Sequence, residues 1–268
     1  MPVPPASSPT RPSGEILTLG GGGFSMEESP LLDDFLLSLA SRRRGADGLP
    51  RVCFVPTASG DSTDYQARFT AAFVGRAETS TLQLFRLNEL PGGLDLRSFV
   101  LSQDIVYVGG GSTANLLALW RLHGLDEVLR EAVAAGVVLA GISAGMNCWY
   151  DGSSTDSFGP LAALPDGLGF LPGSACPHYD GEAERRPAYH RMIGTGELPA
   201  GYAADDGCAL LWRDGALVEA VSSRPEARAF RVEPGAAGQV TETPLPVRFL
   251  GTSADSASDT RPGPGSAT

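Results

Sequence analysis

The sequence of 268 residues contains no lysine, so arginine supplies all 20 of its basic residues. This absence, together with the lack of a GxxxxGK[ST] motif, excludes the P-loop type of nucleotide site. Histidine is scarce as well, and no HxH or HExxH spacing joins the three that occur: His123, His178 and His190. A zinc site is therefore not expected, and nothing in the sequence calls for an organic cofactor.

Cysteines and long apolar runs are also few. The four cysteines are scattered without a CxxC pair, and Cys53 and Cys208 lie in apolar runs typical of small buried thiols. No uncharged apolar run is long enough to span a membrane, and the N-terminus lacks the basic and apolar regions of a signal peptide. From these absences we expect a cytoplasmic location.

The charge is strongly one-sided, with 31 acidic residues against 20 basic ones and a net charge of -11. An acidic surface repels phosphate groups, so neither a nucleic acid nor an anionic membrane is expected as a partner. The hydrophobic content of 42% is ordinary for a globular protein. Residues 1–14 and 251–268 are rich in Pro, Ser, Gly, Ala and Thr, which predicts flexible tails around one domain at 15–250.

Within that domain, short apolar runs alternate with longer amphipathic ones. The short runs predict strands at residues 16–19, 51–55, 81–85, 105–108 and 137–140. The amphipathic runs predict helices at residues 30–43, 63–74, from 113 onward and 125–135. This order is typical of an α/β fold with a mostly parallel sheet and helices on both faces. Three later runs predict antiparallel strands that finish the domain: 207–212, 216–221 and 229–232.

The strongest local signal is the segment GISAG, residues 141–145, between a predicted strand and a predicted helix start. GxSxG in that context is the nucleophile-elbow pattern, in which a sharp turn presents the serine hydroxyl. Small flanking residues avoid clashes with neighbouring strands and with the substrate. The pattern predicts Ser143 as a nucleophile, with the amide of Ala144 free at a helix N-terminus to bind an oxyanion.

A second glycine-rich turn, GGGST at residues 109–113, follows another predicted strand and opens a helix. Such turns also bind phosphate, but the sequence offers no lysine for that role. We therefore expect the turn to face Ser143, with the Gly111 amide as a second oxyanion donor.

A serine nucleophile needs a neighbouring base. His123 precedes Gly124 at a predicted helix end, and His190 lies in a run with helical spacing, so both have ordinary structural explanations. His178 lies in the loop SACPHYDG, where no periodicity accounts for its side chain, and it is the predicted base. Two acids are candidates to orient it, namely Asp206 beside a strand and Asp156.

Together these segments resemble the peptidase E family of serine peptidases, aspartyl dipeptidases with a class I glutamine amidotransferase-like fold. The matching segments are YVGGGSTANLL, GISAGMN, the PHY around His178 and the pair Asp206-Gly207. The resemblance covers roughly residues 16 to 232. It implies that Ser143 is the nucleophile, His178 the base, and Gly111 and Ala144 the oxyanion donors.

The resemblance also bears on the acid and on the substrate. Asp206 matches the position of the triad acid, which is glutamate in well-known members, and Asp156 matches another acidic position assigned to the relay. We favour Asp206, whose shorter side chain requires a closer approach to His178. Arg185 and Arg186 are the candidate clamp for a substrate carboxylate, although this segment does not clearly reproduce the family's arginine-bearing stretch.

The expected reaction is hydrolysis of short peptides through an acyl-enzyme, with dipeptides bearing an N-terminal aspartate as the implied substrates. A small peptide is thus the expected partner, and the sequence leaves a homodimer open. Three alternatives also stay open: a cyanophycinase-like hydrolase, a carboxypeptidase of the same fold, and an amidotransferase-like protein that binds without hydrolysis.

Overall fold

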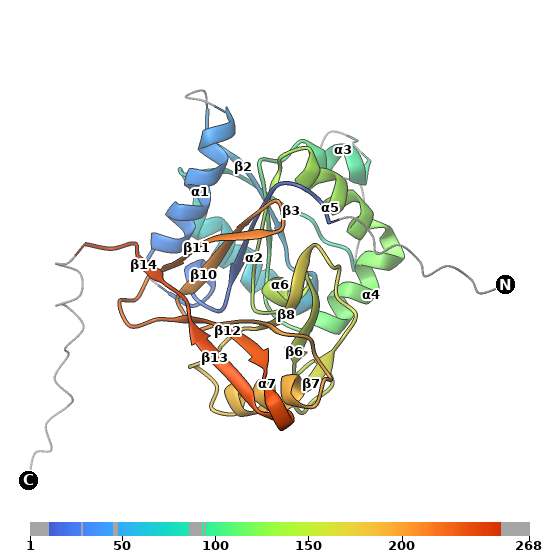
Figure 1. Ribbon diagram of the computed structural model, residues 1–268. Helices are drawn as coiled ribbons and strands as arrows, with labels where there is room; N and C mark the ends of the chain where they lie inside the picture. The colour runs from blue at the N-terminus through green and yellow to red at the C-terminus, as the bar shows by residue number, and fades with distance from the viewer. Residues whose placement is uncertain (1–10, 28, 45–47, 86–92, 94, 253–268) are drawn as a thin grey trace, which may run out of the picture.

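The computed structural model describes residues 11–27, 29–44, 48–85, 93 and 95–252 (Figure 1). Of the predicted tails, residues 1–10 and 253–268 lie outside these ranges, whereas 11–14 and 251–252 lie within them. Within them, the chain builds two β-sheets and the helices that pack against them.

The main sheet has eight strands in the order β14-β11-β10-β1-β5-β4-β2-β3. Its strands are β1 (Glu15–Leu19), β2 (Arg51–Val55), β3 (Glu78–Thr81), β4 (Ile105–Val108), β5 (Val138–Ile142), β10 (Cys208–Arg213), β11 (Ala216–Ser222) and β14 (Val247–Phe249). The five strands from β1 to β3 run parallel, β10 pairs antiparallel with β1 and β11, and β14 is parallel to β11. The predicted mostly parallel sheet is confirmed.

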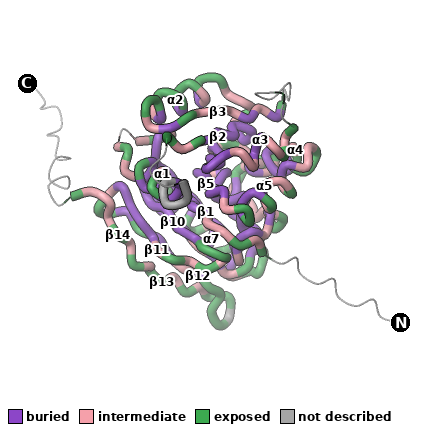
Figure 2. Tube along the Cα trace, turned by 90° about the horizontal axis from the view of Figure 1, so that it is seen from above, coloured by how far each residue is buried: buried purple, intermediate pink, exposed green. Residues whose placement is uncertain are grey.

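Helices cover both faces of this sheet, as predicted (Figure 1). They are α1 (Leu31–Arg44), α2 (Thr63–Phe73), α3 (Leu96–Leu101), α4 (Thr113–His123) and α5 (Leu125–Ala134). The alternation of side chains along β4 shows the two layers, since Ile105 and Tyr107 join a core with α1 and α2, whereas Val106 and Val108 join one with α3, α4 and α5. Seen from above, the central strands β1, β4 and β5 are buried between helices that are exposed on their outer sides (Figure 2).

A second sheet of six strands, in the order β13-β12-β9-β8-β6-β7, was not predicted. It contains β6 (Tyr150–Thr155), β7 (Ala162–Leu164), β8 (Leu171–Cys176), β9 (Gly201–Ala204), β12 (Ala229–Pro234) and β13 (Val240–Pro244). The helix α7 (Arg185–Gly194) packs against it and contributes Tyr189, Met192 and Ile193 to a third core. The short helices are η1 (Gly23–Ser25), η2 (Thr57–Ser59), α6 (Ala144–Asn147) and η4 (Ala236–Gly238).

Two strand predictions need correction. The run at 229–232 does form a strand, but β12 pairs with β9 and β13 in the second sheet and does not extend the main one. A strand pattern identifies the conformation and not the partner, which long-range packing decides. The strand predicted at 81–85 ends at Thr81, and the apolar residues that suggested it, Leu82 and Leu84, are buried in the connection that follows β3.

The parallel strands direct their carboxyl ends to one edge of the main sheet. β1, β4 and β5 end there at Leu19, Val108 and Ile142, and the glycine-rich turns follow them. Open α/β sheets bind their ligands outside this edge, so the fold brings the predicted motifs together at the expected place. Along the described stretches of the chain, no helix has both the length and the apolar character needed to cross a membrane.

Candidate active site

Ser143 lies in the sharp turn between β5 and α6. Its backbone angles are φ 58° and ψ -112°, a conformation that residues with a side chain rarely adopt. The flanking glycines are required by contact: a Cβ on Gly141 would lie 2.3 Å from the carbonyl oxygen of Gly145, and one on Gly145 would lie 2.4 Å from that of Val108. The turn is therefore the strained elbow that the GxSxG pattern predicts.

The end of β1 brings the backbones of Ser143 and His178 together. The Ser143 amide donates to the Leu19 carbonyl at 3.2 Å, and the His178 amide donates to the next carbonyl, that of Gly20, at 3.0 Å. His178 itself has a positive φ of 52°. Two residues that are 35 positions apart in the sequence are thus bound to consecutive residues of one strand end.

The side chains of Ser143 and His178 are both available for a reaction. No hydrogen bond joins Ser143 Oγ to the imidazole, and neither Ser143 Oγ nor His178 Nε2 has another hydrogen-bond partner among the residues described. Hydrogen bonds between a nucleophile and its base are often long in the free enzyme and tighten when substrate binds.

The other imidazole nitrogen contacts Asp206. His178 Nδ1 lies 2.6 Å from Asp206 Oδ1, and the two side chains are 13% and 22% exposed. The carboxylate fits because two neighbours lack side chains: a Cβ on Gly21 would lie 1.9 Å from Asp206 Oδ1, and one on Gly181 would lie 2.2 Å from Oδ2. A carboxylate accepts hydrogen bonds, so it holds the proton on Nδ1 and leaves the Nε2 lone pair free.

The backbone of Asp206 is held by residues that sequence reasoning missed. Its amide donates to Asp180 Oδ1 at 2.8 Å. Its carbonyl accepts two hydrogen bonds from the Arg224 guanidinium, one from Nε at 3.0 Å and one from a terminal nitrogen at 2.6 Å. Arg224 also donates to Asp180 Oδ2 at 2.7 Å. Asp180, two residues after His178, could have been suspected, but nothing in the sequence connects Arg224 to this turn.

Two backbone amides are free, one directly after Ser143 and one in the glycine-rich turn that follows β4. Ala144 is the first residue of α6, and Gly111 has a φ of 134° with space for no side chain, since a Cβ there would lie 2.2 Å from the Ala58 carbonyl oxygen. In the part of the chain that the structure describes, neither amide has a hydrogen-bond acceptor. A Cβ on Gly110 would lie 3.2 Å from Ser143 Cβ, so the glycine-rich turn does approach the serine as expected.

Asp156 is not brought to His178. It follows β6 with 56% of its side chain exposed, and its Oδ2 lies 3.6 Å from a terminal nitrogen of Arg185. Of the two acids that the sequence offered, only Asp206 contacts the imidazole. The role of Asp156 as a relay residue is therefore not supported by the geometry.

The expected clamp of Arg185 and Arg186 is also not formed. The Arg185 side chain is only 3% exposed, and its Nε donates to Glu182 Oε2 at 2.7 Å. Arg186 is bound instead to Glu242 and covers the rings of Tyr179 and Phe230. Consecutive residues of an α-helix point about 100° apart, so the two guanidinium groups serve different partners.

The other candidate groups have structural roles. His123 ends α4 before Gly124, as predicted, and His190 Nε2 lies 2.9 Å from Glu242 Oε2. All four cysteines are free and buried, as the sequence suggested for Cys53 and Cys208, and burial raises the pKa of each thiol. A thiol with a raised pKa is a poor nucleophile, which leaves Ser143 as the nucleophile candidate.

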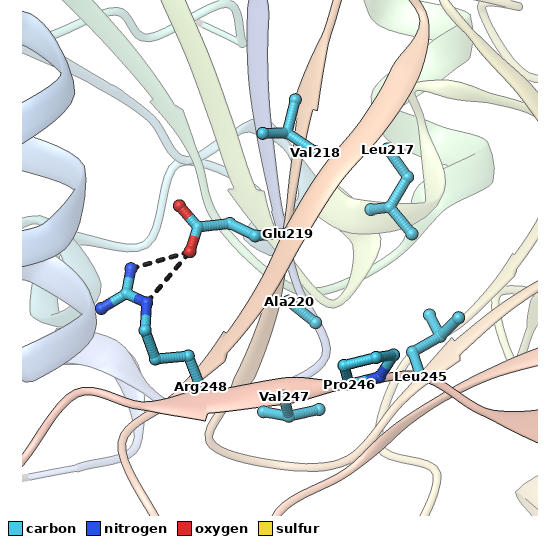
Figure 3. A pocket seen from close by; sticks show the side chains of 8 residues that line it. All are labelled: Leu217, Val218, Glu219, Ala220, Leu245, Pro246, Val247 and Arg248. Atoms are coloured by element: carbon cyan, nitrogen blue, oxygen red, sulfur yellow. Dashed lines mark hydrogen bonds and ion pairs between the residues drawn. The ribbon is translucent and has the colours of Figure 1, made fainter.

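Two further kinds of site were considered. Among the described residues, no group of three or more His, Cys, Asp or Glu side chains could hold a metal ion. A surface hollow between β11 and β14 contains none of the candidate residues, and its charged members, Glu219 and Arg248, pair with each other at 2.8 Å (Figure 3). The chemistry is therefore concentrated at the carboxyl edge of the main sheet.

Comparison with known proteins assigns this arrangement to a family. The model of peptidase family S51 matches residues 16–219, which include Ser143, His178 and Asp206. The chain belongs to peptidase family S51. It is accordingly a serine-type peptidase, as the sequence predicted.

Known proteins are similar to this chain over different lengths. An uncharacterized peptidase of Bacillus subtilis, YgaJ, is 52% identical over 239 residues, which are 88% of this chain and 99% of that protein. Peptidase E of Streptomyces coelicolor is 32% identical over 131 residues, 48% of this chain and 51% of the relative. A crystal structure of a peptidase from an acI-B1 actinobacterium shares the fold, with a TM-score of 0.65 and 17% identity over 89% of this chain and 96% of that one.

Proposed function

We propose that this S51 peptidase hydrolyses short peptides through an acyl-enzyme formed on Ser143. In this proposal His178 is the general base, Asp206 orients it, and the amides of Gly111 and Ala144 bind the oxyanion. The observation that carries the proposal is that the backbone amides of Ser143 and His178 donate to the consecutive carbonyls of Leu19 and Gly20. In addition, His178 Nδ1 lies 2.6 Å from Asp206 Oδ1.

The reaction begins when Ser143 Oγ attacks the peptide carbonyl while His178 Nε2 takes its proton. The negative charge on the former carbonyl oxygen is stabilised by the two free amides, each such donor contributing about 3 kcal/mol in comparable enzymes. His178 then donates the proton to the leaving amine, which departs and leaves an ester on Ser143. A water molecule that gives its proton to His178 hydrolyses this ester, and the serine is restored.

Asp206 stabilises the imidazolium that forms in each half of the reaction. It also keeps the neutral ring in the tautomer with Nδ1 protonated, so that Nε2 can act as the base. The backbone bonds of Asp206 to Asp180 and Arg224 limit how far its carboxylate can move away.

The acyl-side residue of the substrate is expected to lie near Arg185. The carbonyl of Ser154 accepts from Arg185 at 3.4 Å and also from the Asn147 side chain at 3.1 Å, and Asn147 belongs to α6, which Ser143 opens. Arg185 is enclosed by Glu182 and Asp156, so the group carries two negative charges and one positive charge. This balance gives no support to a preference for N-terminal aspartate.

The test of the mechanism is Ser143→Ala on the purified full chain. The variant is expected to lose turnover of every dipeptide that the wild type cleaves and to lose labelling by a fluorophosphonate probe. Circular dichroism and the melting temperature serve as controls for folding. Turnover that survives in Ser143→Ala removes Ser143 from the mechanism, and a wild type that neither cleaves nor reacts with the probe favours a binding protein.

The substrate class is tested with a matched panel. Asp-Leu, Ala-Leu and Arg-Leu differ only in the acyl-side residue, while N-acetylated and C-amidated forms of one dipeptide report which terminus is recognised. Cyanophycin, the β-linked aspartate-arginine polymer, is assayed beside them. Cleavage of Asp-Leu alone would restore the aspartyl preference, and cleavage of the polymer alone would identify a cyanophycinase-like enzyme.

A further inference from the structure

Glu27 places a partly buried carboxylate behind the turn that carries Asp206. The residue follows the glycine-rich turn after β1 and η1, and its Oε2 accepts from the Gly23 amide at 3.1 Å. A Cβ on Gly207 would lie 2.8 Å from Glu27 Oε1, so the carboxylate contacts the residue directly after Asp206.

Ser223 joins Glu27 to the same turn. Its hydroxyl oxygen lies 2.8 Å from both carboxylate oxygens of Glu27 and 3.2 Å from the carbonyl oxygen of Gly207. The Ser223 amide also donates to the Gly207 carbonyl at 2.8 Å, and the Gly207 amide donates to Gly21 at 3.0 Å. Both the amide and the carbonyl of Gly207 are therefore hydrogen-bonded. Because Gly207 directly follows Asp206, these bonds also fix the backbone that carries the Asp206 side chain.

The Ser223 hydroxyl donates toward the Glu27 carboxylate, and its oxygen lies 2.8 Å from both carboxylate oxygens. Burial raises the pKa of Glu27, while the hydrogen bonds from Ser223 and from the Gly23 amide lower it. The carboxylate therefore links the turn after β1 to the turn that carries Asp206.

The charged surroundings of Glu27 come from several elements. Arg224 favours the ionised form, whereas the negative charge of Asp206 opposes it. Asp33 of α1 and Tyr107 of β4 also interact electrostatically with Glu27. Glu27 therefore interacts electrostatically with the acid that contacts His178.

We propose that Glu27 is a positioning residue for the catalytic acid, acting through Ser223 and Gly207 to hold Asp206 against His178. The inference rests on the proposed roles of Ser143, His178 and Asp206. No covalent step involves Glu27, which instead fixes the turn from which the Asp206 carboxylate projects.

The experiment compares Glu27→Ala with Glu27→Gln in the full chain, on the dipeptide that the wild type cleaves best. Glu27→Ala is expected to lower kcat about tenfold or more and to change KM less than about twofold, because misplacing a catalytic group by an ångström costs up to about 10²-fold. The acid limb of the kcat/KM profile moves to lower pH, since the imidazolium loses a fixed partner. Glu27→Gln retains kcat within about threefold, because its amide donates to Ser223 and its oxygen accepts from Gly23.

Ser223→Ala gives a second measurement if Glu27→Ala folds poorly. It removes the hydroxyl that connects Glu27 to Gly207, and it is expected to lower kcat in the same direction. The double variant Glu27→Ala/Ser223→Ala should be no slower than the slower single variant, because both changes break one connection.

Several outcomes overturn the inference. One is that Glu27→Ala folds, keeps the wild-type kcat and leaves the acid limb of the kcat/KM profile unmoved. Another is that Glu27→Gln lowers kcat as much as Glu27→Ala does. Strictly multiplicative effects of Glu27→Ala and Ser223→Ala do so as well. Failure of the proposed function is distinguishable, because it appears as turnover in Ser143→Ala whatever the Glu27 variants do.

Discussion

Replacing Gly21 with alanine adds one methyl group at the place where the loops carrying His178 and Asp206 meet. The backbone of Gly21 pairs with Asp206 in an isolated β-bridge, and its φ is not among the positive values that exclude alanine. The change therefore removes no functional group and imposes no backbone strain. Its effect comes from the contact of the new methyl group alone.

The size of that effect follows from the distances. The new Cβ would lie 1.9 Å from Asp206 Oδ1 and 3.1 Å from His178 Nδ1, whereas real Cβ contacts stay above 3.0 Å. The carboxylate must therefore retreat by about 1 Å, and an error of that size in a catalytic group costs about 10²-fold. Complete loss of the orienting acid costs about 10⁴-fold in comparable enzymes. We expect kcat of Gly21→Ala to fall between these limits, with KM changed little.

The assay is steady-state hydrolysis of the best dipeptide, with thermal unfolding measured in parallel. Only the end of a flexible side chain has to move, so the melting temperature should change little. Gly235→Ala is the matched control, because Gly235 lies in an exposed turn where the nearest atom to a new Cβ is 3.2 Å away. It should retain wild-type kcat.

A double-mutant cycle decides the cause. If Gly21→Ala acts by displacing Asp206, then adding it to Asp206→Ala should cost almost nothing further. A folded Gly21→Ala with wild-type kcat would refute the reasoning, and so would a full additional loss in the double variant.

The remaining predictions concern the carboxylates of Asp206, Asp156 and Asp33. Asp206→Asn should lower kcat about 10⁴-fold by favouring the wrong tautomer of His178, whereas Asp156→Asn should leave kcat within about threefold; equal losses in the two variants would restore Asp156 to the relay. Burial raises the pKa of Asp33 from 3.8 to about 7, so this group opposes folding increasingly as pH rises through that interval. Asp33→Asn should therefore raise the free energy of unfolding at pH 8 by at most about 4 kcal/mol and change it little near pH 4, as measured by urea unfolding at both pH values; equal effects at the two pH values would contradict the raised pKa of Asp33.

The local parts of the site could be predicted from the sequence. GISAG between an apolar run and a helix start specifies the elbow because the strand, the turn and the helix are neighbours along the chain. His178 could be selected because only two other histidines compete with it and both lie in helices. These inferences needed no knowledge of which distant segments meet.

The choice of the acid depended on long-range pairing. Asp206 and Asp156 both follow or precede strands, and only the bridge between Gly21 and Asp206 decides which one reaches His178. The same limit explains the error at 229–232, where the conformation was predictable and the partner strand was not. The different partners of Arg185 and Arg186 follow from helical spacing, which separates consecutive side chains by about 100°.

The anchoring of Ser143 and His178 to adjacent carbonyls of one strand end has a mechanical consequence. Any small displacement of β1 moves Ser143 and His178 together. Small motions of the sheet therefore leave the spacing between nucleophile and base nearly constant. An insertion of one residue between Leu19 and Gly20 would have the opposite effect, because it would separate the two anchors by one extended residue, about 3.3 Å. The spacing of nucleophile and base should thus survive small displacements of β1 but not an insertion at this single peptide bond.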